Sequence, residues 1–260
     1  MTVIETYAPG TFCWADLGTP DAAAAKRFYT GLFGWRLEDR PMGPDATYTM
    51  FSLQEKSVAA LYQQEPQQPG MPPHWLSYIS VDSAAAAARR TRELGGAVLM
   101  EAFDVLDVGR MALIQDPSGG VVALWEPRRH IGAGVVGEPN TLCWHELATT
   151  DVAGAGRFFG ELFGWRREVQ QLGAVSYTMF TRDEGAAAGG MVQIGPDWGP
   201  VPPHWLVYFS VADCDASAER ARELGASVKV PPSDIPGIGR FAVLEDPQGA
   251  AFAIIRLSDA

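Results

Sequence analysis

The sequence predicts an α+β protein made of two tandem copies of one domain. Three observations support this prediction: a repeat with an offset of about 130 residues, helices with clear start and stop signals, and several short strand-like segments after each helix. A single strand, then a helix, then a run of strands is typical of α+β folds with mixed sheets. The 260 residues are enough for two such domains, each able to bury its own core.

The repeat consists of blocks that recur in the same order. Cys13-Trp14 recurs as Cys143-Trp144, and the Pro-Pro-His-Trp-Leu stretch at 72–76 recurs at 202–206. One offset that holds through seven blocks is too regular for chance, and it is too long for a solenoid, so it indicates domain duplication. We expect a first domain at 1–127, a linker at 128–139 and a second domain at 140–260. The linker contains the stretch Ile131-Gly132-Ala133-Gly134, which is flexible in composition.

The first half of each copy follows one plan. In the first copy, a strand is expected at 11–17, and a helix opens at Pro20-Asp21 and carries an apolar stripe. Gly34 is placed to end this helix, and strands follow at 47–53 and 58–63.

The second half repeats the plan. A strand at 75–81 leads to Asp82-Ser83, which is expected to cap a helix that runs through Leu94 and stops at Gly95-Gly96. Strands are expected at 98–100, 111–115 and 121–125. The order strand, helix, several strands therefore occurs four times in the chain.

Composition excludes several classes of function. The net charge is −11 and the longest basic run is Arg128-Arg129, so a nucleic-acid partner is not expected. No apolar stretch approaches the length of a membrane span, and residues 1–10 do not have the pattern of a signal peptide. Three cysteines, an odd number, indicate reduced thiols and a cytoplasmic protein.

Two motifs resemble a known family. The block at 11–35, with Asp21, Phe28-Tyr29 and Leu32-Phe33-Gly34-Trp35, resembles the opening strand and helix of the vicinal oxygen chelate superfamily, which includes glyoxalase I, bleomycin-resistance proteins and extradiol dioxygenases. Asp116-Pro117-Ser118-Gly119 resembles its Asp-Pro-x-Gly turn, and both motifs recur at 141–165 and 246–249. The resemblance implies tandem glyoxalase-like domains, each of two βαβββ modules that form a curved mixed sheet around a pocket.

The resemblance also implies where a metal would bind, because metal-using members place His, Glu or Gln ligands on four facing strands. In the first copy these positions correspond to Trp14, the Ala59-Ala60 pair, Leu76 or Trp75, and Ala123. In the second copy they correspond to Trp144, Gly189-Gly190, Leu206 or Trp205, and Ala253. None of these side chains ligates a metal ion. We therefore expect no metal and no cofactor at this position.

The remaining polar residues leave alternatives open. His145 follows the lost ligand by one residue, so it is expected on the opposite face of its strand. His74 and His204 follow Pro-Pro at a strand entrance, where we favour a structural or pocket-rim role over metal ligation. Asp16 and Glu146 are either solvated or capping carboxylates or acids at the pocket mouth. The candidate catalytic residues are Asp16, Glu146, His74 and His204.

The cysteines do not suggest a nucleophile. Cys13 and Cys143 are expected to alternate to the face opposite the tryptophans and to act as small buried hydrophobes. Cys214 begins a helix and has no counterpart in the first copy.

Aromatic residues replace the metal on the face that would line each pocket. We expect the ligand-binding residues to be Phe12, Trp14, Tyr48, Met50, Tyr62, Tyr78 and Trp125 in the first copy, and Trp144, Tyr177, Met179, Tyr208 and Phe241 in the second, with Trp198 from a Pro/Gly-rich loop. Half of them are expected to be plain core. The others offer flat surfaces with a polar handle, suited to a planar ligand.

The sequence thus predicts metal-independent binding of a hydrophobic or aromatic small molecule, of an antibiotic or polyketide type, by a resistance or biosynthesis-auxiliary protein. The alternative is a metal-free enzyme that performs acid–base chemistry on such a ligand. A metal-dependent lyase or dioxygenase is disfavoured by the lost ligands. Four modules in one chain could replace a dimer of two-module subunits, so a monomer or a homodimer is expected.

Overall fold

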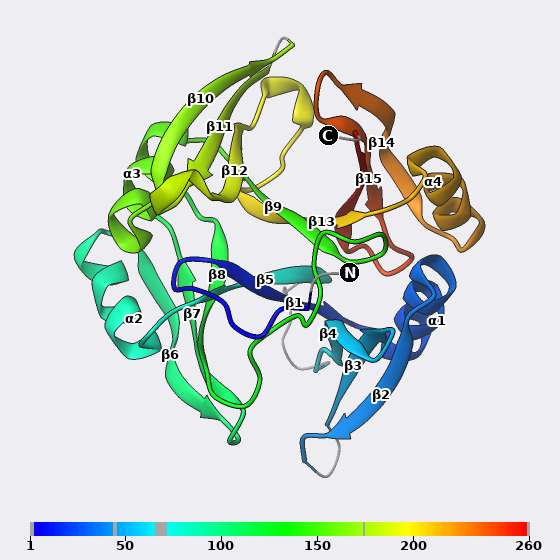
Figure 1. Ribbon diagram of the computed structural model, residues 1–260, viewed down its shortest axis with the longest axis horizontal. Coiled ribbons are helices and arrows are strands. Elements are labelled where there is room, and N and C mark those ends of the chain that lie inside the picture. Colours follow the sequence, from blue (N-terminus) through cyan, green and yellow to red (C-terminus); the bar gives the residue numbers. More distant parts are fainter. Residues whose placement is uncertain (1–2, 44–45, 66–71, 174, 259–260) are drawn as a thin grey trace.

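The computed structural model describes residues 3–43, 46–65, 72–173 and 175–258, and it contains two eight-stranded mixed sheets, one from each copy (Figure 1). The first copy comprises β1 (Phe12–Thr19), α1 (Ala22–Phe33), β2 (Arg36–Pro41), β3 (Thr47–Leu53), β4 (Lys56–Gln63), β5 (His74–Ser80), α2 (Ala84–Glu93), β6 (Ala97–Val105), β7 (Gly109–Gln115) and β8 (Val121–Pro127). The second comprises β9 (Leu142–Thr149), α3 (Val152–Phe163), β10 (Arg166–Leu172), β11 (Val175–Thr181), η1 (Asp183–Gly185), β12 (Ala187–Gln193), η2 (Pro196–Trp198), β13 (His204–Ser210), α4 (Cys214–Glu223), β14 (Ser227–Ile235), β15 (Gly239–Glu245) and β16 (Ala251–Leu257). The predicted α+β fold of tandem glyoxalase-like domains is confirmed.

The helices begin and end where the sequence signals indicated. The Asp21 side chain accepts a hydrogen bond from the backbone N–H of Ala24 at 2.9 Å and caps α1. Gly34 ends α1 in the left-handed conformation with φ 68°. Ser83 caps α2, which ends at Glu93 with Leu94 as its C-cap. Among the described residues, no helix is long and apolar enough to cross a membrane.

Two edge strands were not expected from the residue pattern. All six residues of β2 are exposed, so its sequence shows none of the apolar–polar alternation by which half-buried strands are recognised. It pairs antiparallel with β3, from Arg36 opposite Ser52 to Pro41 opposite Thr47. The similarly polar β10 occupies the same edge in the second copy. Backbone pairing to a neighbouring strand, and not side-chain burial, accounts for both.

Each sheet joins the two modules of its own copy. The order is β2-β3-β4-β1-β5-β8-β7-β6, and β9 to β16 repeat it as β10-β11-β12-β9-β13-β16-β15-β14. At the centre β1 runs antiparallel to β5, while the outer neighbours β4 and β8 run parallel to them. The sheets curve, and their concave faces open toward opposite sides of the molecule (Figure 1). We name the concave face of the first sheet cup 1 and that of the second cup 2.

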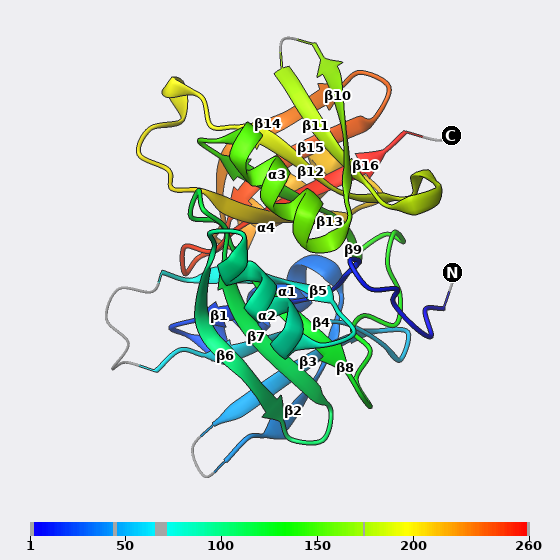
Figure 2. The ribbon, with the colours of Figure 1, turned by 90° about the vertical axis from the view of Figure 1, so that its left-hand side faces the viewer.

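The two sheets pack back to back through their helix-covered faces. Helix α1 lies beside α4, and α2 lies beside α3, between the cups (Figures 1 and 2). One core cluster combines side chains of α1 and β1 with side chains of β13 and β16. A second combines α2 and β8 with α3 and β12. Each half of one copy therefore forms its core with the opposite half of the other copy.

The linker is a fixed part of the structure, contrary to what its glycine-rich composition indicated. Its residues 130–136, here named the strap, cross one end of cup 1 as the green segment between β8 and β9 in Figure 1. Backbone N–H groups of Ala133 and Gly134 donate to the carbonyls of Cys13 and Ser57, both at 2.8 Å. Gly132 has φ 121°, and a Cβ there would lie 2.2 Å from the Cys13 carbonyl oxygen. Glycine is therefore needed for close approach and not for flexibility.

Candidate functional site

The residues that line each cup follow from strand register. In cup 1, Trp14 lies opposite Tyr78, and Tyr78 lies beside Ala123. These residues belong to a cluster that contains no helix residue, so they are on the concave face. The same row in cup 2 is Trp144, Tyr208 and Ala253.

A buried carboxylate forms the centre of the floor of cup 1. The hydroxyls of Tyr48 and Tyr78 both donate to Oδ2 of Asp16 at 2.8 Å, and Nε1 of Trp14 donates to the Tyr48 hydroxyl at 3.0 Å. Burial raises the pKa of Asp16 to about 6, although the two tyrosines oppose this shift. Asp16 is 2% exposed, so the solvated-carboxylate alternative is wrong, and it lies on the floor and not at the mouth.

Cup 2 contains the same network with a longer acid. Tyr208 donates to Oε1 of Glu146 at 3.0 Å, and Nε1 of Trp144 donates to the Tyr177 hydroxyl at 2.8 Å. Tyr177 also lies near the carboxyl group and favours its charged form. Burial raises the pKa of Glu146 above its ordinary value, and the two tyrosines oppose this. The network is preserved although aspartate is replaced by glutamate.

A β-bulge changes the face of two predicted residues. The register of β1 against β5 shifts between Phe12 and Trp14, so Phe12 points to the helix-covered side and stacks on His145 with ring centroids 4.1 Å apart. The assignment of Phe12 to the ligand-binding face is therefore wrong. Cys13 is buried as expected, but it packs in the same cluster as Trp14 and not on the opposite face. His145 lies on the opposite face as expected, and burial lowers its pKa to about 3.

The other predicted ligand-binding residues are buried to different extents. Met50 and Trp125 are buried in cup 1, and Tyr62 is half-buried opposite Tyr48. In cup 2, Met179 and Phe241 are partly buried against the floor clusters. Trp198 lies in η2 and is 46% exposed.

The two Pro-Pro-His residues lie at the ends of the cups. His204 begins β13 opposite Ala148, on the face that carries Glu146, and His74 has the equivalent place opposite Gly18. In each histidine, Nδ1 lies 2.9 Å from the carbonyl oxygen of the proline two residues earlier, which is Pro72 for His74 and Pro202 for His204. A carbonyl only accepts, so Nδ1 carries the hydrogen.

The strap covers the end of cup 1. The His130 ring meets Trp14 edge to face with centroids 4.7 Å apart, and Trp125 donates to the His130 carbonyl at 2.8 Å. The Tyr7 hydroxyl donates to the carbonyl of Ala133 at 2.7 Å. Burial, with a smaller effect of Arg40, lowers the pKa of His130 to about 4. Sequence reasoning missed the roles of Tyr7 and His130, since neither lies on a cup strand.

The tryptophan and the carboxyl group of the floor are buried in cup 1 and partly exposed in cup 2, whereas the tyrosine differs the other way: Tyr48 is half-buried and Tyr177 is buried. Trp14 is 3% exposed and Asp16 2%, whereas Trp144 and Glu146 are both partly exposed. Cys143 and Met179 are likewise more exposed than their buried counterparts in cup 1. Where the first copy has Tyr7, the repeat places Gly137.

The residues at the family's metal positions do not fit a metal ion. Trp14, Leu76 and Ala123 face cup 1, and Trp75 points away into the core. The corresponding Trp144, Leu206 and Ala253 face cup 2. None offers a ligand atom, and the described residues contain no group of three or more His, Cys, Asp or Glu side chains that could hold a metal.

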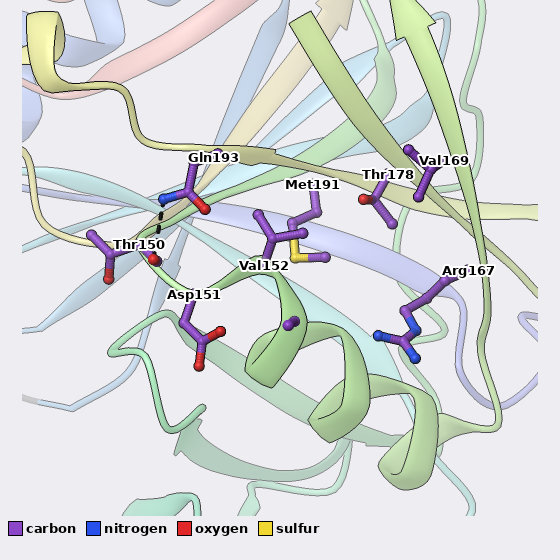
Figure 3. A pocket seen from close by; sticks show the side chains of 9 residues that line it. Thr150, Asp151, Val152, Arg167, Val169, Thr178, Met191 and Gln193 are labelled. Carbon is purple, nitrogen blue, oxygen red and sulfur yellow. Dashed lines mark hydrogen bonds between the residues drawn. The ribbon is translucent and has the colours of Figure 1, made fainter.

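A shallow hollow of about 620 Å³ lies elsewhere, between the start of α3 and β10 to β12 (Figure 3). Two of its polar side chains are engaged: Asp151 caps α3, and Gln193 donates to the Thr150 carbonyl. In the first copy the equivalent space holds the Lys26–Asp39 ion pair. The repeat places Gly156 and Val169 at the positions of Lys26 and Asp39. The hollow therefore lies where the second copy lacks these two charged side chains.

Comparison with known proteins identifies the family. A family model for the glyoxalase/bleomycin resistance protein/dioxygenase superfamily matches residues 11–124, and one for a glyoxalase-like domain matches 144–255. The chain belongs to this superfamily. It is 43% identical over 252 residues to CFP32 of Mycobacterium tuberculosis, provisionally named a glyoxylase, covering 96% of each chain. It is 39% identical to the anthracycline biosynthesis protein DauV of Streptomyces sp. and 38% to DnrV of Streptomyces peucetius, covering at least 95% of each chain.

Solved structures agree with this fold. The Mn(II)-bound glyoxalase from Novosphingobium aromaticivorans superimposes with a TM-score of 0.64 at 17% identity, covering 95% of this chain and 82% of that one. The 2,3-dioxygenase LapB from Pseudomonas sp. KL28 gives a TM-score of 0.65 at 14% identity, covering 96% and 92%. At these identities the likeness concerns the fold alone.

Proposed function

We propose that cup 2 binds a flat aromatic small molecule without the help of a metal ion. One observation carries the proposal: Trp14 and Asp16 are buried in cup 1, whereas their counterparts Trp144 and Glu146 are partly exposed in cup 2. Trp144 and Phe241 present aromatic surface there, with Glu146 as the central polar group. Such a mixture of apolar surface and few polar groups is typical of small-molecule sites.

The contents of cup 1 support this ligand class. At its end of cup 1, the strap places an imidazole ring edge-on to Trp14 and the small apolar Ala133 against the same cluster. An equivalent position on Trp144 would suit a ring supplied by a ligand. The second copy also has smaller side chains at two cup positions, Ile255 in place of Trp125 and Val192 in place of Tyr62.

The relatives support a biological setting. DauV and DnrV are named for anthracycline biosynthesis, and they match this chain over nearly its whole length. Anthracyclines contain a flat, hydroxylated polycyclic ring system, which belongs to the ligand class proposed for cup 2. We therefore favour an auxiliary protein of the biosynthesis of, or resistance to, an aromatic polyketide-type compound.

Calorimetric titration with naphthalene, naphthol and anthraquinone tests the proposal. We expect at least one of these flat aromatics to bind, and Trp144→Ala to weaken that binding by at least about tenfold through lost ring contacts. Trp14→Phe is the matched control, because Trp14 is beneath the strap, and it should leave the affinity unchanged. Absence of binding by every probe, or equal affinity in Trp144→Ala, would contradict the proposal.

Acid–base catalysis in cup 2 is a second candidate. It is favoured by the raised pKa of Glu146 and by the position of this carboxyl group on a partly exposed floor. Incubation of the protein with a bound hydroxylated aromatic, followed by mass and absorbance analysis, distinguishes it from simple binding. A product whose formation is abolished by Glu146→Gln supports catalysis, and unchanged ligand excludes it for that compound.

A further inference from the structure

We propose that the part of the ligand that reaches the floor of cup 2 is a hydrogen-bond donor, either a ring hydroxyl or an ammonium group, and that Glu146 accepts it. The proposal rests on the proposed function, since it assumes that cup 2 is the binding site. It adds the polarity of the ligand, which the aromatic surface alone does not specify.

The donors around Glu146 already have acceptors. Nε1 of Trp144 donates to Tyr177, Tyr208 donates to Glu146, and Tyr177 favours the charged form of the same carboxyl group. Nδ1 of His204 donates to the Pro202 carbonyl at 2.9 Å. The neighbours directly across from Glu146 are Gly190 and Leu206, whose side chains have no polar atom.

What remains around Glu146 is therefore acceptor capacity. A carboxylate has two oxygens with about four acceptor sites, and Tyr208 uses one of them. Cup 1 shows the surplus directly: Tyr48 and Tyr78 both bond to Oδ2 of Asp16, and Oδ1 is buried without a hydrogen-bond partner among the described residues. A ligand carbonyl, carboxylate or phosphate would meet acceptors only, whereas a donor would complete the network.

The depth and surroundings of Glu146 favour a donor attached to a ring. The carboxyl group lies on the central strand β9, two residues from Trp144 on the same face. A ring packed against Trp144 can thus direct a substituent toward the carboxylate. The net charge of −11 further disfavours an anionic group and does not oppose a cationic one.

Matched pairs of probes test the inference. At neutral pH we expect naphthol to bind at least about tenfold more tightly than its methyl ether, because the ether has the same ring but no donor. Naphthylmethylamine, compared with its N-acetyl derivative, tests the ammonium source in the same way. A preference within the first pair assigns a hydroxyl donor, and one within the second assigns an ammonium donor.

Variants locate the effect. Glu146→Gln should reduce the preference to less than about threefold, because the amide supplies both a donor and an acceptor, and Glu146→Asp should retain part of it. Asp16→Asn is the matched control in the covered cup and should leave the preference unchanged. If the two members of each pair bind equally well, and Trp144→Ala abolishes the binding of all of them, this inference is overturned but the proposed function is not. If no aromatic probe binds, both fail.

Discussion

Cups 1 and 2 carry the same floor but differ in what lies over it. Each has a tryptophan that donates to a tyrosine, and each has a carboxyl group that accepts from a tyrosine of the neighbouring strand. The strap and Tyr7 pack against cup 1, where Trp14 and Asp16 are buried, while Trp144 and Glu146 of cup 2 are partly exposed. Duplicated sheets can therefore diverge in accessibility through a connecting segment, with little change on the strands themselves.

A second difference lies between the cups, where the copies pack together. Tyr29 accepts a hydrogen bond from Trp75 Nε1 and donates one to Oδ2 of Asp246, both at 2.9 Å. The repeat places Phe159 at the equivalent position. There Trp205 Nε1 and Asp116 Oδ2 have no partner among the described residues. The Tyr29 hydroxyl thus satisfies a buried N–H and a buried carboxyl oxygen in one half of the interface, and the other half has no hydroxyl at Phe159.

The strap substitution Gly132→Ala has the largest expected effect. The new Cβ would collide with the Cys13 carbonyl, so the strap must leave cup 1 or shift its backbone. We expect the free energy of unfolding in urea to fall by about 3 kcal/mol or more. Gly137→Ala is the control, since Gly137 also has positive φ but has nothing within 4 Å of a Cβ. It should cost about 1–2 kcal/mol. Equal losses would show that the strap is not closely packed.

Exchange of one hydroxyl tests the interface comparison. Tyr29→Phe should lower the free energy of unfolding by about 2 kcal/mol, because it leaves an indole N–H and a carboxyl oxygen buried without partners. Phe159→Tyr should raise it by about 1 kcal/mol by supplying both partners at the other site. Urea unfolding of the two variants and the wild type measures both. A destabilised Phe159→Tyr protein would mean that this site has no room for the hydroxyl.

Acidification gives the smallest effect. The folded-state pKa of His130 is about 4, below its ordinary 6.5, so the unfolded chain binds more protons and stability falls as the pH decreases below 6.5. We expect His130→Phe, which keeps a ring but does not titrate, to remove about 1 kcal/mol of this loss at pH 5.5. Asp16 acts in the opposite direction, since its raised pKa favours the folded state as the pH decreases from about 6 to 3.8.

His145 provides the comparison for this measurement. Its pKa is lowered to about 3 by burial between the copies, so it contributes to the acid loss in both proteins. The loss should therefore be reduced in His130→Phe and not abolished. A wild-type and a His130→Phe protein with the same pH dependence would contradict the burial of the His130 ring against Trp14.

Local signals predicted the repeated architecture because they are properties of short segments. Asp21 and Gly34 identify the limits of α1, and alternation identified Trp14, Tyr78 and Asp16 as candidates on their strands. The resemblance supplied the βαβββ modules, including β2, which has no buried residue to reveal it.

The errors concern features that depend on partners distant in the chain. The β1 bulge that turned Phe12 away is a property of its pairing with β5. The close approach of Gly132 to Cys13 is likewise tertiary, and glycine composition alone cannot distinguish it from flexibility. The bonds of Tyr48 and Tyr78 to Asp16 depend on strand register, so the three residues were proposed singly and not as a network.

The number of naphthol molecules bound per chain tests the central comparison most directly. Calorimetric titration of the intact protein should give one site, because only cup 2 has an accessible floor. That site should be lost in Trp144→Ala and retained in Trp14→Phe. Two equivalent sites per chain, or a single site lost in Trp14→Phe but retained in Trp144→Ala, would contradict the account.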